Sequence, residues 1–333
     1  MKEVVKMFMY IILIVIGFVL LIKGADFLVD GASGIAKKFN IPEIVIGLTI
    51  VSIGTSMPEL VVSVTSALEG HSDIAIGNVV GSNLANLLLI LGVCSVIKPL
   101  EFKKETRIFE IPFMIFSTIL LFFLSINGTS AELNKITRIE GIILLAFCLI
   151  FIIYNFIMAK KGAHFDNEDT LVEIHTYENK EISIFQSLFG IVVGIIGLKL
   201  GGDLVVDNSV QIARLLEISE KLISLTIVAF STSLPELITS IAATRKGDTD
   251  MAIGNIIGSQ IFNILLIIGM SATLMPINYS TSYNSNIILL IVSSIILGLF
   301  PFIGKKNQMS RGNGVLFVFT YFLYLGTIIA FNN

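Results

Sequence analysis

The chain has 333 residues, of which 54% are hydrophobic and 14% are charged, and its formal net charge is −3. Soluble domains usually carry about 25% charged residues, so this composition excludes an ordinary soluble domain. It is typical of an integral membrane protein, with room for about ten spans of roughly 20 residues each. Cys94 and Cys148 lie in apolar runs, which favours small buried or lipid-facing side chains over a disulfide or a metal pair.

Ten apolar segments follow one another along the chain and predict an all-α protein with about ten transmembrane helices. They cover residues 8–30, 41–69, 73–97, 108–126, 139–158, 184–207, 218–245, 250–275, 285–303 and 313–331. The first segment follows Lys2 and Lys6 as a signal peptide would, but no small-residue cleavage site comes after it. It also has a counterpart in the second half, so we expect it to belong to the mature protein.

The chain repeats itself. Residues 48–92 (the first repeat) align with 225–269 (the second repeat) at an offset of 177, and 23 of 45 positions are identical. These repeats lie in the motif regions 47–92 and 224–269 of two five-segment halves, 1–159 and 184–333. A polar stretch, 160–183, separates the halves and is expected to be a cytoplasmic linker. Because five is odd, the second half enters the membrane from the opposite side, which predicts an inverted repeat as found in secondary transporters.

Lys and Arg are distributed unequally between the two sets of loops. Loops after the odd-numbered segments carry 14 of them, namely Lys37, Lys38, Lys98, Lys103, Lys104, Arg107, Lys160, Lys161, Lys180, Arg245, Lys246, Lys305, Lys306 and Arg311. The other side carries six, namely Lys2, Lys6, Lys135, Arg138, Arg214 and Lys221. The positive-inside rule therefore predicts a multi-pass protein of the cell (plasma or inner) membrane with both termini extracytoplasmic.

Each repeat contains a polar stretch inside an apolar run, Gly-Thr-Ser-Met-Pro-Glu at 54–59 and Ser-Thr-Ser-Leu-Pro-Glu at 231–236. Pro58 and Pro235 are helix-breaking residues, because proline has no N–H and its ring clashes with a carbonyl one turn earlier. We expect the breaks to free backbone carbonyls around Ser52 to Gly54 and around Ala229 to Ser231. Irregular backbone at membrane depth is tolerated only where it is buried in protein or lines a cavity, so each break predicts a polar cavity.

The side chains near these breaks offer oxygen atoms and no imidazole, thiol or amine. They are Thr55, Ser56, Glu59, Ser82, Asn86, Thr232, Ser233, Glu236, Ser259 and Asn263. Such a set suits hard cations, since Ca²⁺ takes 6–8 oxygen ligands and softer metals prefer sulfur or nitrogen. Two facing carboxylates repel each other, and a divalent ion, several Na⁺ ions or protons would each relieve that repulsion. Because these ions cannot occupy the same site together, binding of one requires release of the other, which is the physical basis of exchange.

The patterns G-T-S-x-P-E and G-N-x-x-G-S-N-x-x-N resemble the repeats of the cation/Ca²⁺ antiporter superfamily, in particular its prokaryotic-type Na⁺/Ca²⁺ exchangers. The resemblance implies that Glu59 and Glu236 are the central Ca²⁺ ligands and that Thr55 and Thr232 supply backbone carbonyls. It implies flanking Na⁺ sites and two amides beside the centre. These involve Ser56, Ser233, Ser82, Ser259, the backbone oxygens of Ser52 and Ala229, and the amides of Asn86 and Asn263. It also implies that the first and sixth spans slide across the core.

The chain departs from the family pattern at three positions. Some members carry Asp where this chain has Asn263, and the potassium-dependent branch resembles that Asp pattern, so Asn263 argues against K⁺ co-transport. Ser231 replaces the first glycine of the motif in the second copy, and Gln260 replaces an asparagine. These differences make the two halves unequal and leave the ion stoichiometry open.

Other features allow a structural or a functional interpretation. Glycines recur in the first and sixth segments, where they indicate either tight helix packing or a smooth surface for sliding. Asp26, Asp30, Asp203 and Asp207 are interpreted as solvated residues near the ends of those segments, with ion entry as the alternative. The G-N-x-x-G segments 77–81 and 254–258 are interpreted as close-packing contacts against the broken helices.

The function that we expect is secondary-active exchange of Na⁺ for Ca²⁺ by alternating access, normally exporting Ca²⁺. Ca²⁺/H⁺ exchange and K⁺-dependent exchange are the alternatives within this class, and a passive cation channel is the alternative from another class. We expect no enzyme activity and no cofactor, because no nucleophile–base pair or nucleotide motif is present. The expected partners are Ca²⁺, Na⁺ and the lipid bilayer, with no nucleic acid and no nucleotide, and the protein is expected to function as a monomer.

Overall fold

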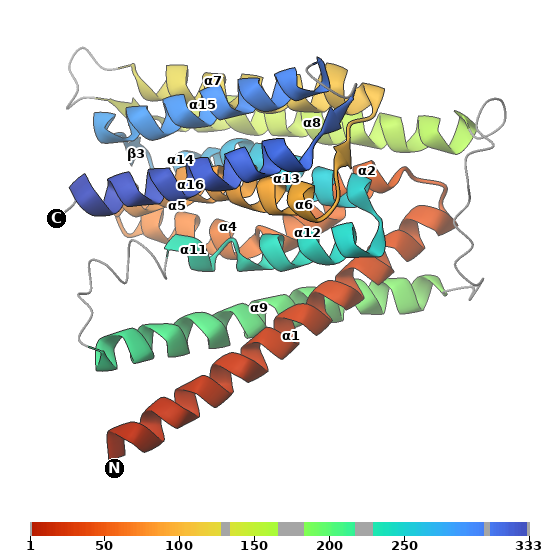
Figure 1. Cartoon of the computed structure of the whole chain (residues 1–333). Helices are drawn as coiled ribbons and strands as arrows, with labels where there is room; N and C mark the ends of the chain where they lie inside the picture. Colours follow the sequence, from red (N-terminus) through yellow and green to blue (C-terminus); the bar gives the residue numbers. More distant parts are fainter. Residues whose placement is uncertain (1, 128–133, 166–182, 217–228, 303–306, 332–333) are drawn as a thin grey trace.

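The computed structural model describes residues 2–127, 134–165, 183–216, 229–302 and 307–331. It is almost entirely helical, with two short β-ribbons (Figure 1). In chain order the elements are α1 (Lys2–Lys38), α2 (Glu43–Ile46), η1 (Gly47–Val51), α3 (Ser52–Thr55), α4 (Met57–Leu68), α5 (Ser72–Leu84), η2 (Ala85–Ile90), α6 (Leu91–Ile97), β1 (Leu100–Glu101), η3 (Thr106–Glu110), α7 (Ile111–Ser125), β2 (Lys135–Ile136), α8 (Arg138–Phe165), α9 (Ile184–Leu215), α11 (Ala229–Ser231), α12 (Leu234–Lys246), α13 (Thr249–Phe262), η6 (Asn263–Ile268), α14 (Gly269–Leu274), β3 (Ile277–Asn278), η7 (Thr281–Tyr283), α15 (Asn284–Leu299), η8 (Phe300–Phe302), β4 (Gln308–Met309) and α16 (Arg311–Phe331).

The predicted class, an α-helical membrane protein, is confirmed. Within the described residues seven helices are long and apolar enough to cross a membrane, or eight if the bent pair 43–55 and 57–68 is one span. α16 forms a further helix of 21 residues over the tenth predicted segment. Part of the seventh predicted segment and most of the linker 160–183 lie outside the described residues. The number of ten spans and their inverted arrangement therefore stay predictions.

The second predicted span is broken as expected, and the break lies at Ser56. The helix axis bends by 50° between α3 and α4, and Ser56 has φ −83° and ψ 9°. Pro58 lies in the first turn of α4, where a missing N–H leaves no hydrogen bond unmade. Ser233 has nearly the same backbone angles, φ −87° and ψ 1°, directly before α12 and its Pro235. The two breaks thus share the backbone angles of their serine, but the N–H of Ser56 donates to Ser52, four residues earlier, and that of Ser233 donates to Phe230, three residues earlier.

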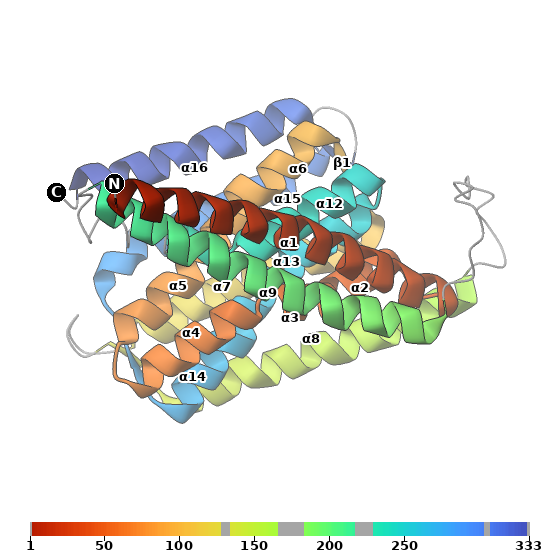
Figure 2. The same cartoon turned by 90° about the horizontal axis from the view of Figure 1, so that it is seen from below.

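α1 and α9 lie against each other on one side of the helix bundle, as both views show (Figures 1 and 2). Their glycines face one another at the crossing. A Cβ atom added to Gly24 would lie 2.7 Å from the backbone nitrogen of Leu198, and one added to Gly194 would lie 2.6 Å from that of Leu28. These contacts are too short for any side chain. The packing interpretation of these glycines is therefore confirmed.

α1 is longer than predicted, because it continues from the apolar run to Lys38. Asp26 and Asp30 therefore lie inside a continuous helix, and the Asp30 side chain is largely exposed. Both carboxylates pair with Lys246 at the end of α12, at 3.4 Å and 2.7 Å. This ion pair lets charged residues remain on a helix face that packs against the bundle, and it joins the α1–α9 pair to the rest of the protein.

The two spans that follow the breaks form the centre of the bundle. In the most apolar stretch of each span, 72% of the first (Ser72–Ile97) and 94% of the second (Thr249–Leu274) is buried inside the protein. α13 packs closely on α2 and η1 through its glycines. A Cβ on Gly254 would lie 2.5 Å from the carbonyl oxygen of Ile44, and one on Gly258 would lie 2.7 Å from Oγ of Ser52. The predicted close packing of the G-N-x-x-G segment is thus confirmed for the second repeat.

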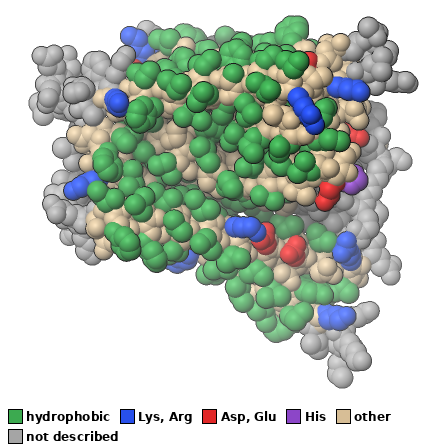
Figure 3. Space-filling view, turned by 180° about the vertical axis from the view of Figure 1, so that it is seen from behind, with side chains coloured by type: hydrophobic (Ala, Val, Ile, Leu, Met, Phe, Trp, Pro, Cys, Tyr) green, Lys and Arg blue, Asp and Glu red, His purple; other side chains and the backbone are tan. Residues whose placement is uncertain are grey.

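Two antiparallel ribbons connect distant loops at opposite ends of the bundle. β1 pairs with β4 through Leu100 and Met309, and β2 pairs with β3 through Ile136 and Ile277. β3 lies at the end near the two termini in Figure 1, and β1 lies at the other end in Figure 2. On the main body of the molecule in Figure 3, hydrophobic side chains cover the face between charged side chains near its ends, as expected for contact with lipid.

Candidate cation-binding site

The two motif carboxylates are fully buried in the middle of the bundle. Glu59 lies in the first turn of α4 and Glu236 in the first turn of α12, and both side chains are 0% exposed. One oxygen of each carboxylate accepts a hydrogen bond from a serine, whereas Oε2 of each has no hydrogen-bond partner among the described residues. Each half-helix N-terminus also directs its positive dipole end toward its own carboxylate.

Hydrogen bonds join the two motifs directly. Ser56 of the first repeat donates to Oε1 of Glu236 at 2.9 Å. Ser82 donates to Oε1 of Glu59 at 3.4 Å and lies 3.3 Å from the hydroxyl of Thr232 in the second repeat. Glu236 is therefore bonded to a serine of the other half, and the serine that is bonded to Glu59 contacts a threonine of the other half. We call the ten oxygen-bearing side chains predicted from the motifs, from Thr55 to Asn263, the oxygen cage.

The asparagines Asn86 and Asn263 each lie at the start of a π-helical stretch. Asn86 is the second residue of η2 (Ala85–Ile90), and Asn263 is the first residue of η6 (Asn263–Ile268). Short π-helical insertions are rare and frequently occur at functional sites. Neither amide atom of the buried Asn86 has a partner among the described residues. Nδ2 of Asn263 donates to Oδ1 of Asn83 at 3.0 Å, and Oδ1 of Asn263 has no partner there.

The orientation of Asn263 is fixed by a backbone group. Nδ2 of Asn83 donates to the carbonyl of Gln260 at 3.3 Å, and a carbonyl oxygen can only accept. Oδ1 of Asn83 must therefore face Asn263 and accept its N–H. This leaves the oxygen of Asn263, and not its nitrogen, available to another partner. Gln260 itself donates to Ser294 at 3.3 Å, a contact that helps to make the two halves unequal.

Three more of the predicted ligand residues, Ser52, Ser233 and Ser259, are buried. Ser233 and Ser259 are 0% exposed, and neither hydroxyl has a partner among the described residues. Ala229 begins α11, the first described element of the second motif. The expectation of a free carbonyl at Ser52 was wrong, because this oxygen accepts the N–H of Ser56 at 3.0 Å. The break lies one residue after α3, so the last hydrogen bond of that helix is still made.

The chemistry of the cage suits a hard cation. All of its side chains offer carboxylate, hydroxyl or amide oxygens, and several buried oxygens lack a partner, which is costly unless a ligand satisfies them. No group of three or more His, Cys, Asp or Glu side chains that could hold a metal occurs in the described part of the chain. Cys94 and Cys148 are buried and free, as predicted.

The sequence interpretation missed three asparagines that contact the cage. Asn78 and Asn255 hydrogen-bond to Thr232 and Thr55, at 3.2 Å and 3.1 Å, and Asn83 binds Asn263. Asn78 and Asn255 belong to the G-N-x-x-G segments, where the glycines drew attention to packing alone. The signal that could have identified them was the presence of an amide at equivalent positions in both repeats.

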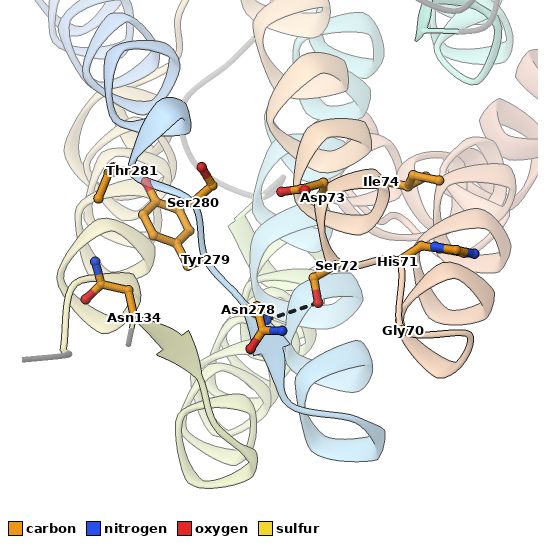
Figure 4. A pocket seen from close by; sticks show the side chains of 10 residues that line it. All are labelled: Gly70, His71, Ser72, Asp73, Ile74, Asn134, Asn278, Tyr279, Ser280 and Thr281. Atoms are coloured by element: carbon orange, nitrogen blue, oxygen red, sulfur yellow. Dashed lines mark hydrogen bonds between the residues drawn. The ribbon is translucent and has the colours of Figure 1, made fainter. Parts of the chain in front are cut away.

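A separate surface pocket of about 600 Å³ lies at the end of the bundle near β3 (Figure 4). It is lined by the turn between α4 and α5 and by the segment that follows β3, and a hydrogen bond from the backbone of Asn278 to Ser72 joins the two sides at 3.0 Å. Asp73 points from α5 toward the side of the pocket that carries Tyr279 and Ser280. None of the cage residues lines this pocket, so it is distinct from the candidate site.

The comparisons with known proteins agree with this geometry. A family model described as "Sodium/calcium exchanger protein" matches residues 9–157 and 186–330. The chain belongs to the sodium/calcium exchanger family. It is therefore a member of the cation/Ca²⁺ antiporter superfamily, as its motifs indicated, and a multi-pass membrane protein. The family consists of transporters, which is consistent with the expectation that the chain is not an enzyme.

Two relatives and a solved structure match this exchanger-family chain along nearly its whole length. The inner membrane protein YrbG of Escherichia coli is 32% identical over 95% of both chains. The sodium/calcium exchanger MaX1 of Methanosarcina acetivorans is 31% identical, over 94% of this chain and 97% of the relative. A solved structure of the sodium-calcium exchanger NCX_Mj, soaked with Na⁺ and Ca²⁺, has a TM-score of 0.78 and 30% identity, covering 96% of this chain and 98% of that one.

Proposed function

We propose that this protein is a secondary-active antiporter that exchanges Na⁺ for Ca²⁺ and normally exports Ca²⁺. The observation that carries the proposal is the pair of buried carboxylates, Glu59 and Glu236, each hydrogen-bonded to a serine and each with one oxygen that lacks a partner among the described residues. The transported ions are substrates, and no cofactor takes part. In this proposal both glutamates bind the central Ca²⁺, with carbonyl oxygens of Thr55 and Thr232.

The ligands proposed for the flanking Na⁺ sites are the serines of the cage. They are Ser56, Ser233, Ser82 and Ser259, with the backbone oxygens of Ser52 and Ala229 nearby and the amides of Asn86 and Asn263 beside the central site. Since the Ser52 carbonyl is bonded to Ser56 in this conformation, its use requires that bond to lengthen or to be shared. A carbonyl oxygen has two lone pairs, so sharing is chemically possible.

Exchange follows from the charge of the cage. Two unneutralised carboxylates in a low-dielectric interior repel each other strongly. One Ca²⁺ ion compensates this charge, and so do two or more Na⁺ ions, but both loads together do not fit the same oxygen atoms. The cage therefore holds one load or the other. If the cage can switch between opening to one side of the membrane and opening to the other only when it holds ions, the two ion fluxes are coupled.

Alternating access is supported by the arrangement of the chain. The family model matches the chain in two stretches, 9–157 and 186–330, which correspond closely to the proposed halves. β-Ribbons pair the loop after the third predicted span with that after the ninth, and the loop after the fourth with that after the eighth. Such pairing is expected if loops of the same parity share one side of an inverted ten-span protein.

The proposed orientation and state complete the account. Both termini lie outside and the loops rich in Lys and Arg lie in the cytoplasm, in the plasma or inner membrane. The paired helices α1 and α9 form the unit that slides across the core, because they contact each other more extensively than they contact the rest. The protein functions as a monomer in this proposal, since the whole cage is built from one chain.

The coupling ion is tested by transport. The purified protein is reconstituted in vesicles, and ⁴⁵Ca²⁺ uptake is followed under an outward Na⁺ gradient, an outward H⁺ gradient, or neither. The proposal expects saturable uptake with the Na⁺ gradient alone and no requirement for K⁺. Uptake driven only by the H⁺ gradient would identify a Ca²⁺/H⁺ exchanger instead. Uptake that needs neither gradient and does not saturate would identify a passive channel.

A further inference from the structure

Asn78 and Asn255 occupy equivalent positions in the two repeats, the second position of each G-N-x-x-G segment. Each amide contacts a threonine of the opposite repeat and a serine of its own. Oδ1 of Asn255 accepts from the hydroxyl of Thr55 at 3.1 Å, and Nδ2 of Asn255 donates to Ser240 at 2.9 Å. The same side chain therefore connects the first motif to helix α12 of the second.

The second connection repeats this pattern with the halves exchanged. Oδ1 of Asn78 accepts from the hydroxyl of Thr232 at 3.2 Å, and Nδ2 of Asn78 donates to Ser63 at 2.9 Å. Thr232 is 177 residues after Thr55, and Ser240 is 177 residues after Ser63, so every member has its counterpart. Two equivalent hydrogen-bonded chains in one structure indicate a shared role.

The direction of the hydrogen bonds is determined by backbone chemistry. Nδ2 of Asn78 also lies 3.3 Å from the carbonyl oxygen of Glu59, which can only accept. The amide oxygen of Asn78 must then face Thr232, and the hydroxyl of Thr232 must donate its hydrogen to it. With that hydrogen directed away, Thr232 presents oxygen lone pairs to its other neighbours. In the proposed function Thr232 offers its backbone carbonyl to the ion, so this bond acts by holding the threonine side chain in place with its hydroxyl hydrogen directed at Asn78.

The two threonines also lie where the backbone changes direction. Thr55 is the last residue of α3, directly before the break at Ser56, and Thr232 follows α11 directly before Ser233. A side chain that is hydrogen-bonded at this point restricts the orientation of the adjacent peptide groups. In the G-N-x-x-G segment 254–258, the glycines already account for the close packing, since Gly254 and Gly258 contact α2 and η1. The asparagine is not needed for that contact.

We propose that Asn78 and Asn255 are positioning residues of the cation cage, each fixing the threonine of the opposite repeat without contacting the ion. This inference rests on the proposed function, because it assumes that the cage binds a transported cation. It assigns to each G-N-x-x-G segment a role in cation affinity in addition to its packing. It also predicts which threonine each asparagine acts through, Thr232 for Asn78 and Thr55 for Asn255.

Double-mutant cycles test the pairing. The variants are Asn78→Ala, Thr232→Val and their double, with the mismatched double Asn78→Ala with Thr55→Val as the internal control. We expect each single change to raise the half-saturating Ca²⁺ concentration by about fivefold, as loss of one intramolecular hydrogen bond would. In the matched double variant, Asn78→Ala with Thr232→Val, the half-saturating Ca²⁺ concentration is expected to rise about as much as in the more affected single variant. In the mismatched double variant the two single increases are expected to multiply. The mirror cycle uses Asn255→Ala with Thr55→Val.

Two readouts separate this inference from the proposed function. One is Na⁺-driven ⁴⁵Ca²⁺ uptake, and the other is the rise in apparent unfolding temperature that Ca²⁺ or Na⁺ produces in detergent, which requires binding but no transport. If the wild type binds Ca²⁺ but shows no Na⁺-driven exchange, the proposed function fails. The double-mutant cycles measured by Ca²⁺ binding then still test the role of the two asparagines. If the wild type binds neither ion, both proposals are contradicted.

Asn155→Ala provides the matched control for a buried asparagine. Asn155 is 1% exposed in α8, and its side chain donates to the carbonyl of Phe151 in its own helix. We expect the substitution to change the yield or the thermal stability without changing the half-saturating Ca²⁺ concentration. The inference is overturned if the matched and mismatched doubles behave alike, or if Asn78→Ala behaves as Asn155→Ala does.

Discussion

Ser56 donates a hydrogen bond to Glu236, with 2.9 Å between the hydroxyl oxygen and Oε1. These residues are 180 positions apart in the sequence and belong to different repeats, so neither half of the chain completes the site alone. The bond orients one carboxylate oxygen of Glu236, while Oε2 has no partner among the described residues. The two motifs therefore form one cage and not two separate sites.

This contact predicts the effect of Ser56→Ala. The change removes a hydroxyl from the proposed Na⁺ site and a donor from Glu236. Hydrogen bonds to charged groups contribute about 1.5–3 kcal/mol, so the half-saturating Na⁺ concentration should rise by about tenfold or more. The measurement is ⁴⁵Ca²⁺ uptake at a series of internal Na⁺ concentrations. Ser125→Ala, which removes a buried hydroxyl that is bonded within α7, should leave the Na⁺ dependence as in the wild type.

Asn263→Asp is predicted to make exchange strongly dependent on pH. A deprotonated aspartate at this position could not donate to Oδ1 of Asn83, which Asn263 contacts at 3.0 Å, and it would add a third negative charge to the cage. Protonation restores both the donor and the neutral charge. We therefore expect the variant to approach wild-type exchange at acidic pH and to depart from it at alkaline pH. Parallel pH profiles of the variant and the wild type would contradict this.

The same variant tests the interpretation of K⁺ independence. If the amide at this position accounts for the absence of K⁺ co-transport, uptake by Asn263→Asp should respond to K⁺ at alkaline pH and wild-type uptake should not. The measurement is ⁴⁵Ca²⁺ uptake with and without K⁺ on the side that contains Na⁺. A K⁺ response of the same size in both proteins would show that this position does not determine K⁺ dependence.

Lys246→Gln is predicted to loosen the contact between α1 and α12. Lys246 pairs with Asp26 and Asp30, and these partly exposed ion pairs contribute about 0.2–1 kcal/mol each, together enough to change a conformational equilibrium by up to about thirtyfold. A cysteine replacing Ser33, which is 9% exposed and hydrogen-bonded to Asp248, should then react faster with a water-soluble thiol reagent. Cys94 and Cys148 are replaced by alanine in all variants compared.

Lys199→Gln is the control for this experiment. It breaks the Lys199–Asp203 ion pair, which lies within α9 and joins no other helix. Equal reaction rates of the Ser33→Cys reporter in the Lys246 and Lys199 variants would show that the ion pairs of Lys246 do not hold α1 in place.

Asp248→Asn is predicted to change the dependence of stability on pH. Asp248 lies between α12 and α13, outside the spans, and burial raises the pKa of its carboxyl above the ordinary value, against the opposing hydrogen bond from Ser33. Because the folded-state pKa is the higher one, the neutral carboxyl favours folding at acidic pH, and this contribution is lost as the pH rises through the raised pKa.

Asparagine keeps a neutral side chain at every pH. The apparent unfolding temperature of Asp248→Asn relative to the wild type should therefore increase as the pH is raised from about 4 to 7. Asp207→Asn, a change at an exposed carboxyl in α9, should show no such trend. A constant difference for Asp248→Asn across this range would contradict the expected effect of burial.

Several features could be predicted from the sequence because local chemistry determines them. Pro58 and Pro235 predicted the helix breaks, since a missing N–H acts wherever the residue lies. The spacing of 177 residues predicted equivalent positions for Glu59 and Glu236. The structure places both in the first turn of a half-helix. The all-oxygen composition of the site followed from the residue types alone.

Other features depend on how helices meet, which residue patterns do not specify. The pairing of Thr55 with Asn255 crosses between the repeats over 200 positions and depends on the packing of α13 against α3. The continuation of α1 from residue 30 to Lys38 was not predicted, because the apolar run ends at residue 30 and the partner of Asp26 and Asp30, Lys246, is distant in sequence. The carbonyl of Ser52 keeps its helical partner because the break lies at Ser56 and not earlier.

The most direct test of the two-carboxylate cage is ⁴⁵Ca²⁺ uptake into Na⁺-loaded vesicles by Glu59→Gln and Glu236→Gln. Glu110→Gln serves as the control, because Glu110 is also a buried glutamate, 3% exposed, but belongs to η3 instead of the motifs. We predict that each motif variant falls to the uptake of empty vesicles while Glu110→Gln retains exchange. Robust Na⁺-driven uptake by both motif variants would contradict a cage that binds its cations through these two carboxylates.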